Sequence, residues 1–284
     1  MNDIRTILHR TTRELTLSGS PSARLDAEVL LARFLKTDRM QLVVHPEREL
    51  SDEEAAGFGG WARRRSTGEP VAYILSEKEF WSLAFEVDPA VLIPRPETEC
   101  LIEEVLGVRG DRTAELRIID IGTGSGAIGV VLARELPAAR VAATDISDGA
   151  LEVARRNAVR HGVAGRMEFA RGDLFASFPG DFDLIVSNPP YIPDDVYPEL
   201  PAGIREFEPR TALVAGPDGT AFHRRIIREG LRRLAAGGRI FLEIGEGQRG
   251  LVEALFGEAG GYDEIRFRKD YGGMERVAMA RRKP

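Results

Sequence analysis

From Leu116 onward the chain alternates short apolar runs with longer segments of helical periodicity, and few folds accommodate such an alternation. The apolar runs cover residues 116–119, 141–144, 167–169, 184–186 and 240–242, and helical segments include 127–136 and 151–159. Parallel strands need a long crossover between them, which is usually a helix. The pattern therefore predicts an α/β fold with a doubly wound, mostly parallel sheet.

Four polar residues stand at or just after the ends of these predicted strands. They are Asp120, Asp145, Asp173 and Asn188. Ligands of doubly wound sheets bind beyond the carboxyl ends of the strands. We therefore expect all four side chains around one crevice.

The amino-terminal part of the chain has a different pattern, which predicts a small helical bundle. Apolar residues recur at helical spacing over 4–15 and 25–35, and Ser51 followed by Glu54 is a capping-box sequence. Segments 70–74 and 80–87 are rich in aromatic and β-branched residues, which predicts a pair of strands. We expect a helical domain over residues 1–67, a strand-pair linker over 68–90 and the α/β domain over 91–284.

Composition excludes several classes of function. The formal charge of -6 does not favour binding to nucleic acid by bulk electrostatics, and the single cysteine, Cys100, excludes an intramolecular disulfide. No segment approaches the length of a membrane span, and the amphipathic start is unlike a signal peptide. The four histidines have no metal-ligand spacing, so we expect no metal. These features predict a cytoplasmic protein, and we interpret Arg63, Arg64 and Arg65 as a solvated helix end in preference to a nucleic-acid patch.

A glycine-rich loop follows the first predicted strand. Gly122, Gly124 and Gly126 alternate with Thr123 and Ser125, a spacing unlike the dinucleotide-binding or phosphate-loop patterns. Alone, the loop is as consistent with a structural strand-to-helix turn as with a binding site.

Two acidic residues shift that balance towards binding. Asp145, about twenty residues beyond the glycines, is placed to bind the two hydroxyls of a ribose, although it could instead cap the next helix. Asp173, after the third strand, is placed to accept a hydrogen bond from an adenine ring, which would lie against an apolar side chain.

Asn188, Pro189, Pro190 and Tyr191 form the turn after the strand at 184–186. Each proline fixes its own φ and keeps the residue before it out of the helical region, so the strand must stop rigidly there. The Asn188 side-chain oxygen and the Pro189 carbonyl are two acceptors, and Tyr191 adds a flat aromatic face. This combination favours a planar group that carries an NH2.

The order of glycine loop, ribose acid, adenine loop and Asn-Pro-Pro-Tyr turn resembles the S-adenosylmethionine-dependent methyltransferases that modify an amino nitrogen. Two groups of them share the turn: adenine-N6 methyltransferases of nucleic acid and protein glutamine methyltransferases. Both targets present a planar, weakly nucleophilic NH2. The turn alone does not separate the two groups.

Nearly the whole chain is similar to one family, the release-factor glutamine methyltransferases, which modify the Gly-Gly-Gln loop of class 1 peptide chain release factors. The matching segments are 68–74, 79–81, 92–99, 208–213, 243–245 with Gln248, and 269–270 before Arg276. The helical amino-terminal domain also looks like that family. The resemblance implies methyl transfer from S-adenosylmethionine, with S-adenosylhomocysteine as product, and no metal.

The resemblance also implies roles for individual residues. Gly122, Thr123, Gly124, Ser125 and Gly126 would contact the methionine part of the cofactor, Asp145 the ribose, Asp173 and Leu174 the adenine, and Asn188 both cofactor and substrate. Pro189, Pro190 and Tyr191 would complete the glutamine site, with Asn188, Pro189 and Tyr191 catalytic. Ser76 stands where the family often has glycine, and Leu174 where some members have tryptophan.

Alternatives remain open at this stage. The chain could methylate a glutamine of a ribosomal protein, methylate adenine in nucleic acid, or hold a release factor without catalysis. We expect a monomer whose helical domain helps to dock a release factor and which binds neither nucleic acid nor membrane. Whether Arg95 or the arginine-rich helix over 222–233 contacts the substrate is not decided by the sequence.

Overall fold

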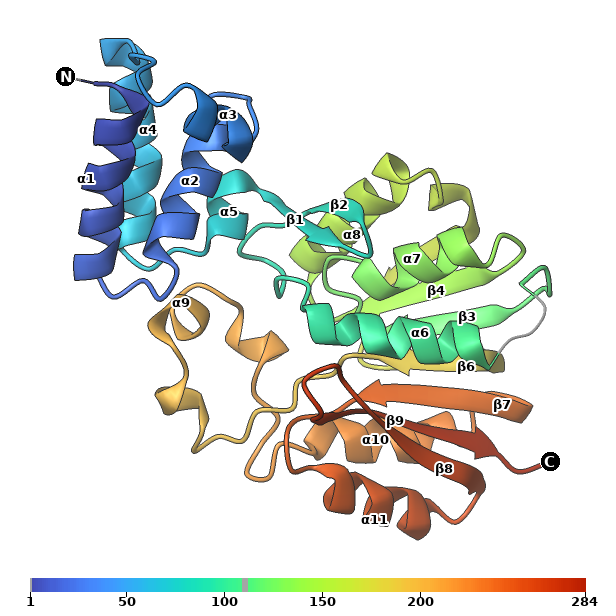
Figure 1. The fold of residues 1–284 in the computed structure, drawn as a ribbon. Helices are drawn as coiled ribbons and strands as arrows, with labels where there is room; N and C mark the ends of the chain where they lie inside the picture. The colour runs from blue at the N-terminus through green and yellow to red at the C-terminus, as the bar shows by residue number, and fades with distance from the viewer. Residues whose placement is uncertain (1, 109–111) are drawn as a thin grey trace. The chain divides into compact units, whose positions relative to one another are not determined.

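The computed structural model describes residues 2–108 and 112–284 (Figure 1). The chain forms two compact units, one of Met1–Glu77 with Pro201–Phe207 and the other of Lys78–Leu200 with Glu208–Pro284. The helical unit thus takes in a short segment from late in the chain. The three-part division at residues 67 and 90 stays a prediction.

The first unit is helical. Its helices are α1 (Ile4–Leu17), α2 (Ala23–Phe34), α3 (Arg39–Val44), α4 (Asp52–Ser66), α5 (Val71–Leu75) and α9 (Ala202–Arg205). The apolar stripe of α1 is buried in a core shared with α2 and α4. The capping box is confirmed, because the Ser51 hydroxyl accepts from the Glu54 N–H while the Glu54 carboxylate accepts from the Ser51 N–H.

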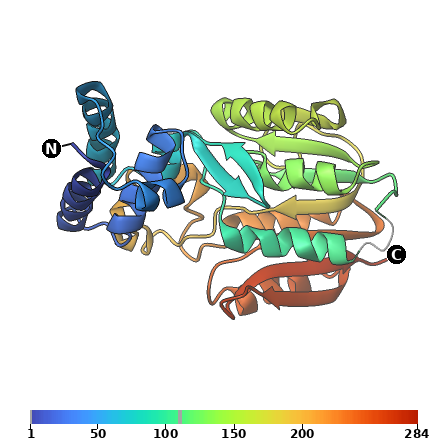
Figure 2. The same cartoon turned by 45° about the horizontal axis from the view of Figure 1, so that its top comes forward.

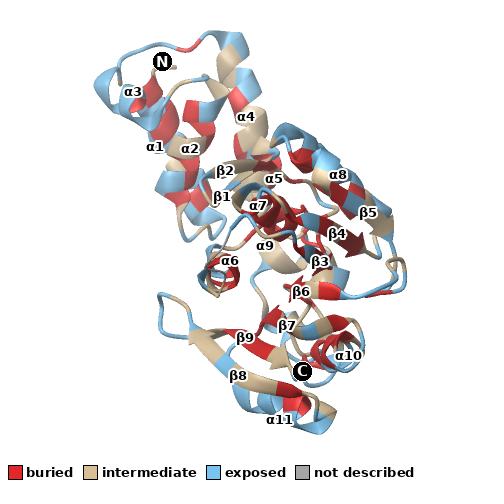
Figure 3. Cartoon of the chain, turned by 90° about the vertical axis from the view of Figure 1, so that its right-hand side faces the viewer, coloured by how far each residue is buried: buried red, intermediate tan, exposed pale blue. Residues whose placement is uncertain are grey.

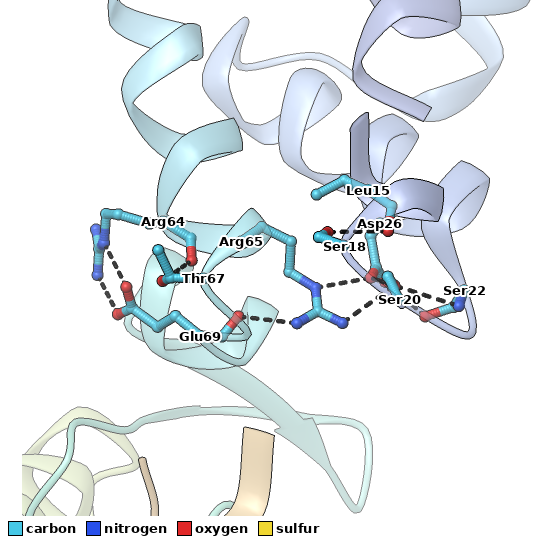
Figure 4. Close-up of polar contacts among 9 residues, drawn as sticks. All are labelled: Leu15, Ser18, Ser20, Ser22, Asp26, Arg64, Arg65, Thr67 and Glu69. Atoms are coloured by element: carbon cyan, nitrogen blue, oxygen red, sulfur yellow. Dashed lines mark hydrogen bonds and ion pairs between the residues drawn. The ribbon is translucent and has the colours of Figure 1, made fainter. Parts of the chain in front are cut away.

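A polar cluster ties the end of α4 to the start of α2 (Figure 4). Arg65 Nε lies 2.8 Å from Asp26 Oδ2, and the hydroxyls of Ser20 and Ser22 donate to the same carboxylate. The interpretation of residues 63–65 as a solvated helix end is wrong for Arg65, whose side chain is only 14% exposed. The Arg65 guanidinium neutralises the Asp26 carboxylate, because a buried carboxylate without a partner is strongly destabilising.

The predicted strand pair is also wrong in its boundaries. Residues 71–74 lie in helix α5, and Pro70 is its N-cap residue. The strands are instead β1 (Glu77–Phe80) and β2 (Leu83–Glu86), which form a hairpin (Figure 2). Its two loop residues, Trp81 and Ser82, have φ of 54° and 55°, as a type I′ turn requires. Ser76, at the position where the family often has glycine, also has a positive φ of 54°.

The second unit contains the predicted sheet. Its strands are β3 (Arg117–Ile121), β4 (Arg140–Asp145), β5 (Met167–Arg171), β6 (Phe182–Ser187), β7 (Leu234–Glu243), β8 (Tyr262–Lys269) and β9 (Glu275–Arg282). Their order is β5-β4-β3-β6-β7-β9-β8. Pairing is parallel from β5 through β7, and β9 runs antiparallel to both neighbours. The doubly wound, mostly parallel fold is confirmed.

Helices cover both faces of this sheet (Figure 1). On one face lie α6 (Glu99–Gly107), α7 (Ala127–Glu135) and α8 (Asp148–Arg160), and on the other lie α10 (Ala221–Gly230) and α11 (Arg249–Ala259). Neighbouring strand residues contribute to opposite cores, as Ile118 and Ile119 do, and both are fully buried. Figure 3 shows buried residues, in red, along β4 and β9. Within residues 2–108 and 112–284, no helix is long and apolar enough to span a bilayer.

Candidate active site

A cavity lies at the carboxyl ends of the parallel strands in the second unit, and its empty volume is about 1060 Å³ including the mouth. This is the edge where doubly wound sheets bind ligands. Most residues predicted for the site line the cavity: Gly122, Thr123, Gly124, Ser125, Asp145, Asp173, Leu174, Asn188, Pro189 and Pro190. Gly126, Tyr191 and Asp120 lie outside this lining.

The glycine loop has a backbone that other residues adopt with strain. Gly122, Gly124 and Gly126 have φ of 68°, 55° and 81°. A Cβ added at Gly122 would meet no protein atom within 4 Å, so it would occupy the cavity that the residue lines. A Cβ at Gly126 would lie 3.1 Å from that of Ala154 in α8, which assigns Gly126 a packing role. The loop therefore forms an open cradle against the start of α7.

We expect Gly122→Ala to weaken cofactor binding by on the order of tenfold or more, because the added methyl group narrows the cradle. Gly162→Ala is the matched control. Gly162 also has a positive φ, 72°, and no protein atom near its Cβ position, but it follows the far end of α8. Both variants should lose about 1 kcal/mol of folding stability through backbone strain. Titration calorimetry with S-adenosylhomocysteine separates them, and equal affinities would contradict a ligand-contact role for Gly122.

The carboxylates at the ends of β3 and β4 both hold the loop. Asp145 Oδ2 accepts from the Gly124 N–H at 3.0 Å, and its Oδ1 accepts from the Ser147 N–H at 2.9 Å. Burial raises the pKa of Asp145. Asp120 was expected to face the crevice but is buried behind the loop, where it accepts from the Thr123 hydroxyl and the Gly129 N–H. Burial raises the pKa of Asp120 to about 6.

Asp173 and Leu174 follow β5 on the side of the cavity that α10 also lines. Asp173 Oδ2 lies 2.7 Å from Arg225 Nη2. One arginine of the arginine-rich helix therefore forms an ion pair with Asp173, which is predicted to bind the adenine ring. Leu174 is buried and has a φ of 51°, which is strained for a bulky side chain. The Thr144 hydroxyl donates to the Leu174 carbonyl at 3.0 Å. Leu174 therefore presents a fixed apolar surface to the cavity.

The Asn-Pro-Pro-Tyr turn directly follows β6, as predicted. Asn188 Nδ2 donates to the Thr98 hydroxyl at 3.1 Å, and the Tyr191 hydroxyl donates to Glu243 Oε1 at 3.3 Å. Gln248 Nε2 donates to the Tyr191 carbonyl at 2.8 Å. The turn is thus held by side chains from other parts of the second unit.

Glu243 is the residue behind this turn that pattern reasoning missed. It is 1% exposed and accepts from the Thr98 hydroxyl at 2.6 Å. Burial raises its pKa to about 7, and the Thr98 bond and the Arg276 charge oppose that rise. Burial and the Glu243 charge also raise the pKa of the Tyr191 hydroxyl. Thr98 is the N-cap residue of α6, but its side chain makes no cap hydrogen bond and donates its hydroxyl to Glu243 instead.

A second buried carboxylate fixes Arg95, whose role the sequence left open. Arg95 lines the cavity, and its Nη2 lies 2.5 Å from Glu208 Oε1. Glu208 Oε2 also accepts from the Ile93 N–H at 3.1 Å. The loop before α6 that contains Ile93 and Arg95 is therefore held in place at one edge of the cavity by Glu208.

Known proteins are similar to this chain over most of its length. Two family descriptions match, "PrmC N-terminal domain" over residues 6–75 and "Methyltransferase small domain" over residues 98–197. A release factor glutamine methyltransferase of Rhodopirellula baltica is 41% identical over 277 residues, covering 95% of this chain and 93% of the relative. One of Moorella thermoacetica is 42% identical over 281 residues, covering 99% of each. This chain belongs to the release factor glutamine methyltransferase family.

A solved structure supports the fold of this family member. A methyltransferase from Pyrococcus furiosus superposes with a TM-score of 0.54 at 18% identity, covering 80% of this chain and all of the other. A likeness at that identity concerns the fold alone. The methyltransferase-type sheet is therefore confirmed independently of the sequence relatives.

Metal ligation was not expected in this methyltransferase. Among residues 2–108 and 112–284, no group of three or more His, Cys, Asp or Glu side chains could hold a metal ion. A reaction without a metal stays a prediction.

Proposed function

We propose that this chain transfers a methyl group from S-adenosylmethionine to the side-chain amide nitrogen of the glutamine in the Gly-Gly-Gln loop of class 1 release factors. The observation that carries the proposal is the Asn188 side chain at the cavity. Its Nδ2 donates a hydrogen bond to the Thr98 hydroxyl oxygen, and its Oδ1 accepts no hydrogen bond from the described residues. An acceptor is thus available on Asn188, and together with the carbonyl of Pro189, which also lines the cavity, it would suit the two N–H bonds of a primary amide.

The cavity fits the cofactor. Gly122 and Gly124 leave room that any side chain would reduce, the Asp145 carboxylate suits ribose hydroxyls, and Asp173 with Leu174 suits adenine. Thr123 and Ser125 complete the cradle, and Gly126 contributes by packing against α8. When bound, S-adenosylmethionine supplies an electrophilic methyl group.

The protein residues must help a poor nucleophile. The amide lone pair is delocalised into its carbonyl, so the nitrogen needs orientation and electrostatic support. If the Asn188 oxygen and the Pro189 carbonyl each accept one N–H, they fix the nitrogen and stabilise positive charge as it develops there. Tyr191, held at both ends by Glu243 and Gln248, would keep the amide plane in place.

A strong base is not required from the chain. A methylated, positively charged amide nitrogen is acidic enough to lose its proton to water after transfer. The residues of the turn therefore orient and stabilise the amide, and none of them needs to remove a proton before methyl transfer.

Further parts of the proposal concern partners and location. The helical unit, whose PrmC-type sequence match covers residues 6–75, would help to dock the release factor. We propose that the protein acts as a monomer in the cytoplasm, where release factors work and where Cys100 would stay reduced. Nucleic acid is not expected as a partner.

The test is transfer of labelled methyl from S-adenosylmethionine to a purified class 1 release factor. The same factor with its loop glutamine replaced by alanine is the matched substrate control. Label on the intact factor alone supports the proposal. Label on neither, with cofactor binding intact, contradicts it, and parallel assays with ribosomal protein, DNA and RNA would then identify the acceptor.

A further inference from the structure

Asn188, Thr98 and Glu243 form a hydrogen-bond chain behind the turn, in which Thr98 and Glu243 are buried and Asn188 is partly exposed. Ser187 of β6 pairs with Leu242 of β7. The next residue after each of them, Asn188 beyond β6 and Glu243 at the end of β7, therefore lies at the same edge of the sheet. Thr98 connects them, since its Oγ1 lies 3.1 Å from Asn188 Nδ2 and 2.6 Å from Glu243 Oε2.

The direction of each hydrogen bond in this chain is fixed by its buried end. The Thr98 hydroxyl donates its single proton to Glu243, and the Tyr191 hydroxyl donates to the other oxygen of the same carboxyl group. Both bonds suit the ionised form of Glu243, which only accepts. The Thr98 oxygen then has only lone pairs to offer Asn188. The amide of Asn188 must therefore turn its NH2 towards Thr98 and its oxygen away.

The opposite orientation of the Asn188 amide would be unproductive. It would place the Asn188 oxygen against the Thr98 lone pairs, leaving two acceptors face to face at a partly buried contact. It would also present an NH2 to the NH2 of a substrate amide, so that two donors would meet. Only one of the two orientations can accept a hydrogen bond from the substrate.

We propose that Thr98 and Glu243 are positioning residues that set which end of the Asn188 side-chain amide faces the substrate. Neither residue needs to touch the reacting atoms. This inference rests on the proposed function, because it assumes that Asn188 accepts from an amide N–H. It assigns a reason for a hydroxyl at position 98 and for a carboxyl group at position 243, which only accepts hydrogen bonds when it is ionised.

Thr98→Val is the first test, because valine keeps the shape of threonine and removes the hydroxyl. We expect kcat for release-factor methylation to fall about tenfold, since Asn188 loses the partner that selects its orientation. The KM for the release factor and the affinity for S-adenosylhomocysteine should stay near the wild-type values. Thr98→Ser restores the hydroxyl and should recover most of kcat, whereas equal kcat of the valine and wild-type enzymes would overturn the proposal.

Combining Thr98→Val with Asn188→Ala separates positioning from a general structural effect. If Thr98 acts through Asn188, the valine substitution should cause no further loss once Asn188 is absent. If the loss of kcat in the double variant equalled the product of the losses in the two single variants, Thr98 would act independently of Asn188. That result would overturn the proposal.

Glu243→Gln tests the other end of the chain. Glutamine can present an NH2 to the Thr98 oxygen, so the hydroxyl proton is no longer committed and Asn188 can adopt either orientation. We expect Glu243→Gln to lower kcat in the wild-type enzyme and to lower it by a smaller factor in the Asn188→Ala enzyme. An equal factor in both enzymes would contradict the proposal. Failure of the proposed function itself is recognised separately, because the wild-type enzyme would then label no release factor.

Discussion

Replacing Asn188 by alanine should lower the rate of release-factor methylation by roughly 10²- to 10³-fold while S-adenosylhomocysteine binding stays near normal. That range is the cost of removing one preorganised dipole from a site where charge develops. A ground-state hydrogen bond contributes only about 1 kcal/mol net, so the expected loss exceeds the strength of the bond itself. Single-turnover kinetics with labelled cofactor measure the chemical step directly.

Two comparisons make the Asn188 result interpretable. Asn188→Asp keeps an acceptor oxygen near the same place, so it should retain more activity than Asn188→Ala. Thermal unfolding of each variant checks that the turn after β6 remains folded. Wild-type rates for the alanine variant would remove Asn188 from the catalytic role proposed for it.

The sequence predicted the main sheet because its signals are local. Alternating apolar runs and helical segments predict parallel strands, and the carboxyl ends of such strands must share one edge. Asp145, Asp173 and Asn188 could therefore be placed together, and all three line the cavity. The capping box at Ser51 was predictable for the same reason, since both of its hydrogen bonds span three residues.

Other features depended on contacts that no local pattern records. Trp81 and Ser82 form the hairpin loop with positive φ, although neither residue is typical of such a turn. Asp120 stands at a strand end like the other acids, but its side chain turns into the protein to hold the glycine loop. Thr98 and Glu243 are 145 positions apart, and their pairing depends on how the loop before α6 lies over the end of β7.

The site therefore has two layers that differ in how they can be inferred. Residues that face the cavity carry recognisable motifs, because their chemistry is set by the ligand. Residues behind them provide hydrogen-bond partners for buried donors and acceptors. Glu208, for example, accepts from Arg95 and from the Ile93 N–H. Only the three-dimensional structure shows which buried residue forms hydrogen bonds with which residue of the cavity.

Asp145→Ala should weaken S-adenosylhomocysteine binding by on the order of 100-fold or more, the second large effect expected for this protein. Hydrogen bonds to a charged group contribute about 1.5–3 kcal/mol each, and a ribose would lose two of them. The Gly124 N–H would also lose its 3.0 Å partner, so the cradle would be less well held. Titration calorimetry of the folded variant gives the affinity.

Asp148→Ala is the matched control for this loss, because it removes the same charge only three residues away. The Asp148 side chain is 65% exposed, pairs with Arg171 and lies outside the cavity lining. Its removal should therefore leave cofactor affinity nearly unchanged. Asp145→Asn keeps one acceptor oxygen, so its cofactor affinity should lie between those of the two alanine variants. If Asp148→Ala weakened binding as much as Asp145→Ala, the effect would come from net charge near the cavity. Wild-type affinity in Asp145→Ala would instead mean that Asp145 serves only the glycine loop and not a ribose.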